Sequence, residues 1–458
     1  MDSSLLWPVI AGLALLLALA SRTVRRFVWT NAVLSWAIWG ALLLRIVGKP
    51  GQGPMRMRKA FEALGPTYVK LGQLVASSEG MFPEAYCLEF RRCLDRVAPF
   101  DAKDVDAILR ADLKRAPDEV FSSFEYAPIA SASIAQVHAA TLRDGTGVVV
   151  KVQRPGLPEI IAADLRVLRV WAQLLARIPV ADLANPVAIV EDFEANLSEE
   201  LDFRREAANL DEFNAIMAQY GMNDVTAPKP HHELSSARVL VMERFFGTRI
   251  DDQATLSTVA PDEVENRLLS GMRAWFRCML VHGFFHGDVH AGNLMALEDG
   301  RLGFLDFGIV GRFDLRRRNL VSEYLLALAT RNFRALAKAM IEMGEMKGID
   351  EAALGADLER VCAPMLDPSK PVKYADFLPV VSRVTMNHRM RMPRDFVLIL
   401  KQMIYFDRYA KLLAPKLNIL ADARIISALM QDFALLRQES ARAASEPPAA
   451  GSVQLATA

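Results

Sequence analysis

The chain has 458 residues, of which 52% are hydrophobic and 24% are charged, and its 54 basic and 54 acidic residues give a formal net charge of zero. This composition predicts a globular protein of about three domain-sized units and excludes a disordered or collagen-like chain. Because the net charge is zero, nothing in the composition favours nucleic-acid binding. The four cysteines form no CxxC pair, so we expect reduced thiols in a protein that faces the cytosol.

Basic charge is concentrated at the N-terminus, together with two apolar runs. The first 60 residues contain eight basic residues and one acidic residue. Residues 3–21 form an uncharged run of 19 residues, which at about 1.5 Å per residue nearly spans the roughly 30 Å core of a bilayer. Residues 27–44 form a second uncharged run, and four of the six tryptophans lie within the first 48 residues. We therefore predict a hydrophobic membrane anchor over residues 1–48.

Two arrangements of this anchor fit the sequence: a single span followed by an interfacial helix, or a helical hairpin. In the first, Arg22, Arg25 and Arg26 keep the body of the protein on the cytoplasmic side. In the second, these arginines would have to cross the membrane, which the same rule disfavours. A cleaved signal peptide and a pair of buried soluble helices are the alternative interpretations, although the N-terminus lacks a basic region before the apolar run.

Periodicity and breaker residues predict the remaining elements in chain order. We expect helices at residues 56–115, 160–176, 187–220, 261–283 and 315–438. A β-hairpin is expected within residues 120–153, with its turn at residues 144–147, and a further strand at residues 237–246. The Pro/Ala/Gly-rich residues 446–458 are expected to be disordered.

Two polar motifs interrupt the apolar sequence: HGDVHAGN at residues 286–293 and DFG at residues 306–308. Asp288 and Asn293 have the D-x4-N spacing of a kinase catalytic loop. Mg²⁺ prefers carboxylate and amide oxygens that converge with phosphate oxygens. Asn293 and Asp306 can supply such a pair from the two ends of a short hairpin. The sequence therefore predicts a Mg²⁺-nucleotide site.

Two upstream features favour the same chemistry. Lys151 ends the run VVVK, where a kinase-like fold places an ammonium against phosphates, and the acidic stretch 199–206 could supply the helix glutamate that holds it. A lysine at the end of an apolar strand is more often a surface residue when it stands alone. A run of charged residues is likewise more often a solvated face. The Ala/Ser-rich residues 130–138 occupy the place of a Gly-rich phosphate loop, and alanine makes that loop stiffer than glycine would.

Two other groups of residues suggest a ligand site less strongly. His282, His286 and His290 recur every four residues, but a loop over residues 284–293 would remove the helical register, so we do not expect a three-histidine metal site. Tyr405, Phe406 and Tyr409 are expected in the core or an interface and not in a cofactor site.

The motifs, in this order, resemble those of the UbiB/aarF family of atypical kinases, which includes the coenzyme-Q-linked kinase-like proteins of mitochondria. The resemblance covers residues 56–312 and also includes KxGQ at residues 70–73 and ExD at residues 200–202. It implies a bilobal α+β protein-kinase-like fold with a small β-containing N-lobe, a helical C-lobe and a helical N-terminal extension that bears KxGQ. The predicted domains are residues 1–48 (anchor), 49–120 (KxGQ extension), 121–247 (N-lobe), 248–330 (catalytic part of the C-lobe), 331–440 (C-terminal helical region) and 441–458 (disordered tail).

The resemblance also implies roles for residues. The catalytic group would comprise Lys70, Gln73, Lys151, Glu200, Asp202, Glu206 and Asp288. The nucleotide-binding group would comprise Ala130, Ser131, Ala132, Ser133, Ile134, Ala135, Gln136, Val137, Lys151 and Glu243. Asn293 and Asp306 would bind Mg²⁺.

The function implied is that of a Mg²⁺-dependent ATPase or phosphotransferase that acts at membranes in ubiquinone biosynthesis. The expected partners are ATP, a membrane lipid or quinone precursor, and quinone-biosynthesis enzymes, at a bacterial inner membrane with the kinase-like domain facing the cytoplasm. An ATP-binding scaffold without turnover is the alternative. Protein kinase activity is less expected, because no Ala-Pro-Glu motif follows Gly308 and Gly287 replaces the arginine of the kinase HRD motif. Membrane segments in a bacterial relative would be expected at the C-terminus, whereas here they lie at the N-terminus.

Overall fold

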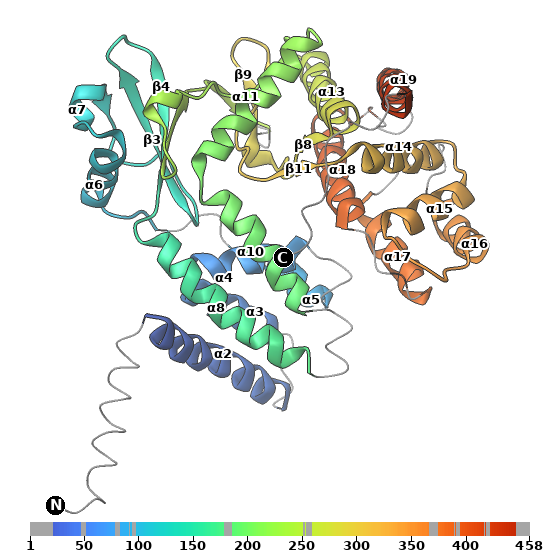
Figure 1. The fold of residues 1–458 in the computed structure, drawn as a ribbon, viewed down its shortest axis with the longest axis horizontal. Helices are drawn as coiled ribbons and strands as arrows, with labels where there is room; N and C mark the ends of the chain where they lie inside the picture. Colours follow the sequence, from blue (N-terminus) through green and yellow to red (C-terminus); the bar gives the residue numbers. More distant parts are fainter. Residues whose placement is uncertain are drawn as a thin grey trace, which may run out of the picture. The chain divides into compact units, whose positions relative to one another are not determined.

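The computed structural model describes residues 22–46, 52–77, 83–90, 92–93, 98–177, 186–250, 252, 259–365, 374–388, 390, 394–415, 417 and 422–445. The chain divides into two compact units (Figure 1). Unit 1 comprises Met1–Asp211 and Pro228–Arg244, and unit 2 comprises Glu212–Ala227 and Phe245–Ala458. One boundary falls within helix α11 (Phe203–Gln219).

The helices of unit 1 come before the first strand of its sheet or between the last two strands. They are α2 (Arg22–Ile46), α3 (Gly53–Leu64), α4 (Pro66–Ser77), α5 (Glu84–Phe90), α6 (Ala102–Leu113), α7 (Pro117–Val120), α8 (Leu157–Leu175) and α10 (Pro186–Glu200). Residues 56–115 are thus not one continuous helical stretch. Gly65, with φ of +98°, ends α3, and Pro66 begins α4, as expected from the positive φ that glycine tolerates and from the preference of proline for a helix start.

Unit 1 contains one antiparallel sheet, in the order β1-β3-β4-β6 with β2 paired to β3. Its strands are β1 (Phe121–Phe124), β2 (Ala130–Ser131), β3 (Ala135–Leu142), β4 (Gly147–Gln153) and β6 (Val239–Glu243). The predicted hairpin is confirmed as β3 and β4. Val148, Val150 and Val152 alternate along β4 and are fully buried against α6 residues such as Val105 and Leu109. This alternation leaves Lys151 on the opposite face of the strand.

Unit 2 contains two small sheets. Strands β5 (Val225–Thr226), β10 (Leu302–Phe304), β9 (Leu294–Leu297) and β7 (Gly247–Arg249) lie in that order in one sheet, and β8 (Phe284–His286) pairs with β11 (Val310–Arg312) in the other. The expectation of a loop over residues 284–293 is therefore wrong at its start. Phe284 and Phe285 form a strand because both are fully buried and pair in register with Arg312 and Gly311.

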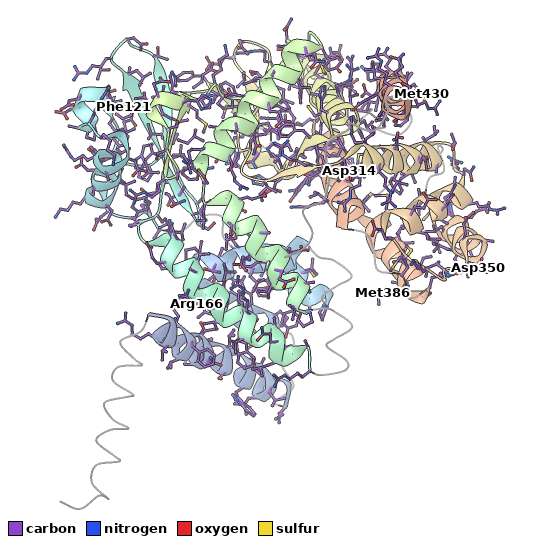
Figure 2. The ribbon with its side chains drawn as sticks, in the orientation of Figure 1. Phe121, Arg166, Asp314, Asp350, Met386 and Met430 are labelled. Carbon is purple, nitrogen blue, oxygen red and sulfur yellow. The ribbon has the colours of Figure 1, made fainter. Side chains whose placement is uncertain are left out.

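The other long elements described in unit 2 are helices. Its helices are α13 (Pro261–Arg277), α14 (Leu315–Ala329), α15 (Phe333–Met343), α16 (Glu351–Cys362), α17 (Tyr374–Asn387), α18 (Arg394–Leu413) and α19 (Ala423–Ser445). Asp314 and Asp350 cap α14 and α16 by accepting backbone N–H groups (Figure 2). Because α19 runs to Ser445, the first five residues of the predicted disordered tail are helical. Residues 446–458 lie outside the described residues.

The buried residues match several predictions from composition. All four cysteines are buried thiols, as expected. Phe406 and Tyr409 are buried in α18, and Trp275 packs edge-on against Phe406. Phe406 and Tyr409 therefore belong to the core, as predicted, whereas Tyr405 is only partly buried.

Helix α2 packs on unit 1 through polar and small side chains. Arg26 forms an ion pair with the fully buried Asp164 of α8, with 2.6 Å between Nε and Oδ1, and Thr30 bonds to the Tyr68 hydroxyl. Ala37 and Gly40 are buried on the same face. Residues Val24–Leu44 are long and apolar enough to cross a membrane, and only 11% of the most apolar window is buried. Thus α2 is not a buried core helix. The first apolar run, residues 3–21, lies outside the described residues.

Candidate functional site

Lys151 and Glu206 form a buried ion pair in unit 1. Strand β4 carries Lys151, and α11 carries Glu206, with its two carboxylate oxygens 2.9 and 2.8 Å from the Lys151 ammonium. The side chains are 9% and 4% exposed. Because a buried ion pair persists only with good geometry, both groups are held in fixed positions. The Lys151 ammonium also lies 5.2 Å from the centre of the Phe203 ring.

A second ion pair links the KxGQ segment to the ExD segment. Lys70 of α4 lies 2.6 Å from Glu200, the last residue of α10. Gln73 follows Lys70 by one turn on α4. Gly72 between them allows α4 to approach α5, because a Cβ there would lie 2.7 Å from the Phe90 ring. The glycine of KxGQ therefore has a packing role.

Asp202 has a different partner from Glu200. It accepts the Arg204 backbone N–H at 3.1 Å and pairs with the Arg204 guanidinium at 2.8 Å. Hydrogen bonding by Arg204 holds the pKa of Asp202 below its ordinary value, although desolvation opposes this. The structure thus brings Lys70 to Glu200, while Asp202 contacts the start of α11.

The Ala/Ser-rich segment forms β2, a tight turn and the start of β3. Ala132 N–H donates to the Ala135 carbonyl at 2.8 Å, and Arg154 donates to the Ala132 carbonyl and the Ser131 hydroxyl. Of the predicted nucleotide-binding residues, Gln136 has a fully buried side chain, which bonds to the Phe100 carbonyl and His138. The Gln136 side chain therefore supports the loop from inside the unit.

Glu243, also predicted to contact nucleotide, is the last residue of β6. Its backbone N–H donates to the Lys229 carbonyl at 2.9 Å, and its carboxylate accepts the Lys229 backbone N–H at 3.3 Å. The described contacts of the Glu243 side chain therefore stabilise the chain segment beside β6.

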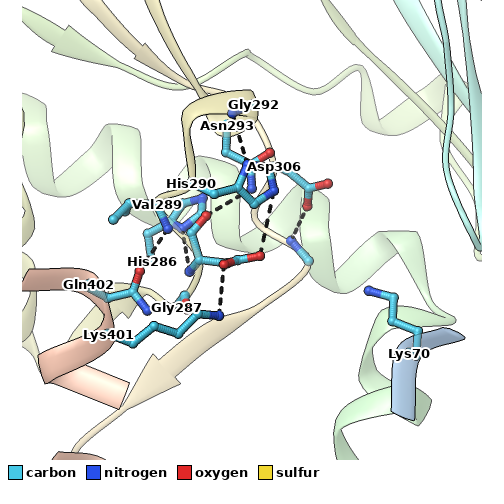
Figure 3. A network of polar contacts seen from close by, with 12 residues as sticks. Lys70, His286, Gly287, Val289, His290, Gly292, Asn293, Asp306, Lys401 and Gln402 are labelled. Carbon is cyan, nitrogen blue, oxygen red and sulfur yellow. Dashed lines mark hydrogen bonds and ion pairs between the residues drawn. The ribbon is translucent and has the colours of Figure 1, made fainter. Parts of the chain in front are cut away.

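The loop that follows β8 in unit 2 carries Asp288 and Asn293 (Figure 3). The Asn293 amide nitrogen donates to the Asp288 carbonyl at 3.0 Å. Asp288 N–H donates to His286 Nδ1, and Gly292 N–H donates to His290 Nδ1. His286 is nearly fully buried, and this desolvation lowers its pKa to about 4, so its imidazole is neutral at pH 7.

Asn293 and Asp306 lie at the open end of the hairpin formed by β9 and β10. Leu294 pairs with Phe304 in this hairpin, and Leu305 N–H donates to the Asn293 carbonyl at 2.9 Å. The DFG turn is closed by Gly308 N–H, which donates to Asp306 Oδ1 at 2.9 Å. A carboxylate and an amide oxygen are hard ligands of the kind that Mg²⁺ takes together with phosphate oxygens, so this donor set fits the ion.

His282, His286 and His290 lie on three different elements. His282 ends the π-helical turn Cys278–His282, His286 ends β8, and His290 precedes a short 3₁₀ helix at Ala291–Asn293. Their four-residue spacing therefore does not place them on one helical face.

Helix α18 supports the Asp288 loop (Figure 3). This support was not predicted from the sequence. Gln402 donates to the Gly287 carbonyl at 2.6 Å and accepts Val289 N–H at 2.9 Å. Tyr409 donates its hydroxyl to the Val289 carbonyl at 3.0 Å, and Lys401 lies 3.1 Å from Asp288 Oδ1. Lys401, Gln402 and Tyr409 lie more than 110 positions after the loop residues that they contact. No local motif marks them.

The charge of Asp288 reflects opposing effects. Desolvation raises the pKa of Asp288, but the Lys401 ammonium and His290 lower it, and the net pKa is below the ordinary value. Asp288 is therefore a carboxylate at neutral pH, able to orient a hydroxyl group or a water molecule.

Comparison with known proteins identifies the family. Residues 92–340 match the model of the ABC1 atypical kinase-like domain, and residues 358–418 match that of the UbiB helical domain. The chain is 37% identical over 400 residues to an uncharacterised aarF domain-containing protein kinase of Arabidopsis thaliana, described as chloroplastic, covering 81% of this chain and 74% of the relative. It is 41% identical over 398 residues to an uncharacterised protein of Mycobacterium tuberculosis, covering 83% and 80% of the two chains.

Relatives with UbiB names are also found. A probable protein kinase UbiB of Pseudomonas putida is 34% identical over 380 residues, which cover 81% of this chain and 69% of the relative. Among solved structures, a Mycobacterium tuberculosis protein in complex with erythromycin is 24% identical, covers 75% of this chain and 91% of its own, and has a TM-score of 0.49. By its matched domains and relatives, the chain belongs to the ABC1 family of atypical kinase-like proteins, and its UbiB/aarF resemblance is confirmed.

Proposed function

We propose that this protein is a membrane-associated, Mg²⁺-dependent ATPase or phosphotransferase that supports the biosynthesis of ubiquinone or a related prenyl lipid. The observation that carries the proposal is the buried pair of Lys151 and Glu206. In kinase-like enzymes a strand lysine held by a helix glutamate binds the nucleotide phosphates. The link to ubiquinone rests on the family resemblance and on the relatives named UbiB.

Each of these side chains has a separate role in the proposed reaction. Lys151 binds phosphate, Asn293 and Asp306 hold Mg²⁺, and ionised Asp288 orients the attacking water or hydroxyl group. Bound Mg²⁺ supplies positive charge against the phosphate oxygens. Phosphoryl transfer needs mainly positioning and electrostatic stabilisation, and these groups are of the kinds that such stabilisation requires.

Membrane association is supported by the outer face of α2. Trp29, Trp36 and Trp39 are each at least half exposed there, together with Leu42 and Leu43. Arg22 and Arg25 lie at the N-terminal end of α2, beside the uncharged run 3–21. We propose that this run crosses a bacterial inner membrane, that α2 lies along the cytoplasmic interface, and that the kinase-like domain faces the cytoplasm.

The test is ATP hydrolysis by the full chain, with and without liposomes. Asp306→Asn keeps an oxygen that can accept the Gly308 N–H but removes the charge that would hold Mg²⁺. We expect turnover to fall by about 100-fold or more. Asp299→Asn is the matched control, because Asp299 lies in the turn of the same hairpin and pairs with Arg301; its turnover should equal that of the wild type.

Turnover that is unchanged by Asp306→Asn, or that does not depend on Mg²⁺, would refute the proposal. Tight ATP binding without ADP release under any lipid condition would instead favour the alternative, an ATP-binding scaffold of a quinone-biosynthetic complex. Including phenolic quinone precursors in the liposomes tests the substrate class in the same assay.

A further inference from the structure

Lys401 brings a basic side chain to the Asp288 loop from the C-terminal helical region. Its ammonium lies 3.1 Å from Asp288 Oδ1, and its side chain is 28% exposed. Because Gln402 and Tyr409 of the same helix bond to Gly287 and Val289, the position of Lys401 relative to the loop is fixed by three further hydrogen bonds. The contact is therefore built into the packing of α18 and is not that of a mobile surface lysine.

The loop itself provides a second basic side chain. His290, two residues after Asp288, has its Nε2 atom 3.8 Å from Asp288 Oδ2. Its Nδ1 atom accepts a hydrogen bond from Gly292 N–H. The Lys401 ammonium, at 3.1 Å, is the closer of these two basic groups to the Asp288 carboxylate.

We propose that Lys401 is a catalytic residue that contacts the terminal phosphoryl group of ATP. The proposal rests on the proposed ATPase or phosphotransferase function. Negative charge spreads over the three outer oxygens of the phosphoryl group during transfer. An ammonium next to the carboxylate that orients the attacking oxygen lies where this charge develops, and lysine binds phosphate as a point charge.

The reaction balances with the groups named. The oxygen of water or of an acceptor hydroxyl forms a bond to the terminal phosphorus while the bond from that phosphorus to the bridging oxygen breaks. ADP leaves with the bridging oxygen and its electron pair. The proton of the attacking oxygen goes to the Asp288 carboxylate, and Lys401 keeps its own protons throughout.

The test compares binding of two nucleotides to the full chain by titration calorimetry. In Lys401→Met, affinity for a non-hydrolysable ATP analogue with Mg²⁺ should fall by about tenfold or more, whereas affinity for Mg-ADP should change by less than about twofold. Lys401→Arg keeps the charge and should retain most of the preference for the ATP analogue. Lys411→Met is the matched control, since Lys411 lies on the same helix and pairs with Asp407 at 2.5 Å.

The outcomes distinguish the proposed role of Lys401 from the proposed function of the protein. Equal losses for both nucleotides would mean that Lys401 only supports the loop, and unchanged affinities would mean that it contacts no phosphate; either result overturns the inference alone. A selective loss supports it, even if the wild type shows no turnover. A wild type that binds neither nucleotide overturns the proposed function and this inference together.

Discussion

At the scale of single residues, the buried Lys151–Glu206 pair has a cost as well as a use. Both groups leave water, and their mutual attraction offsets this desolvation only while both are present. A hydrophobic pair of similar size could replace them with little loss of stability, but it could not bind phosphate. The pair is therefore best explained by function, and its two roles can be separated by mutation.

Lys151→Met should lower the free energy of unfolding of unit 1 by about 3 kcal/mol, because the buried Glu206 carboxylate, which is 4% exposed, loses the ammonium that offsets its desolvation. Adding Glu206→Leu should recover most of this stability without recovering ATP binding. Denaturant unfolding and nucleotide titration measure the two effects. Arg204→Met is the control: it breaks an exposed pair with Asp202 and should cost less than about 1 kcal/mol. Similar costs for Lys151→Met and Arg204→Met would contradict the prediction.

At the scale of elements, α2 reverses the usual pattern of a surface helix. Its polar and small residues, including Arg26 and Thr30, face the protein, and its large apolar residues face outward. Helix α8, which contacts α2, also exposes large apolar residues: Val170, Trp171, Leu174 and Leu175. An apolar face of this kind is typical of a surface that meets lipid or a partner.

The elements also show which features a sequence can predict. The β3–β4 hairpin, which carries Lys151 on β4, and the hairpin between Asn293 and Asp306 join residues that are close in the sequence, so local patterns predict both. The support of the Asp288 loop by Gln402 and the docking of Arg26 on Asp164 join residues more than 100 positions apart. No periodicity encodes such contacts. Glu200 and Asp202 look equivalent in ExD, yet a helix boundary between them gives them different partners.

Spin labels on the outer face of α2 distinguish an interfacial helix from a spanning one. Val28 and Leu43 are both more than half exposed, and their 15-residue separation corresponds to about 22 Å along a helix. In the full chain reconstituted in vesicles, labels at Val28→Cys and Leu43→Cys should report similar depths, with more access to oxygen than to a water-soluble nickel complex. The native cysteines are buried and should label poorly.

The matched control for these labels is Met430→Cys on α19 of unit 2, at an equally exposed apolar residue. This label should remain accessible to the nickel complex. Depths that differ by most of the bilayer thickness between positions 28 and 43 would show that α2 crosses the membrane and would favour the hairpin. If the nickel complex reaches the labels at positions 28 and 43 as readily as the label at Met430→Cys, α2 does not contact lipid.

At the scale of the whole molecule, the two units should respond differently to acid, because His286 belongs to unit 2. Burial lowers the pKa of His286 to about 4, from an ordinary value of 6.5. Between these values the unfolded chain binds a proton that the folded chain excludes. The stability of unit 2 is therefore unaffected by this group above pH 6.5, falls as the pH drops through the window, and is reduced by about 3 kcal/mol near pH 4.

Unit 2 contains a single tryptophan, Trp275, which donates its indole N–H to the His286 carbonyl at 2.9 Å. In protein labelled with fluorotryptophan, the fluorine NMR signal of Trp275 reports the unfolding of this unit by denaturant. The midpoint denaturant concentration should fall steadily from pH 6.5 to pH 4 in the wild type.

His286→Asn can still accept Asp288 N–H but cannot titrate there. The midpoint of this variant should therefore be lower at pH 7 and change less with pH. His232→Asn, at an exposed histidine of unit 1, should behave like the wild type. Equal pH dependence of the Trp275 signal in the wild type and His286→Asn would show that His286 is not the group responsible.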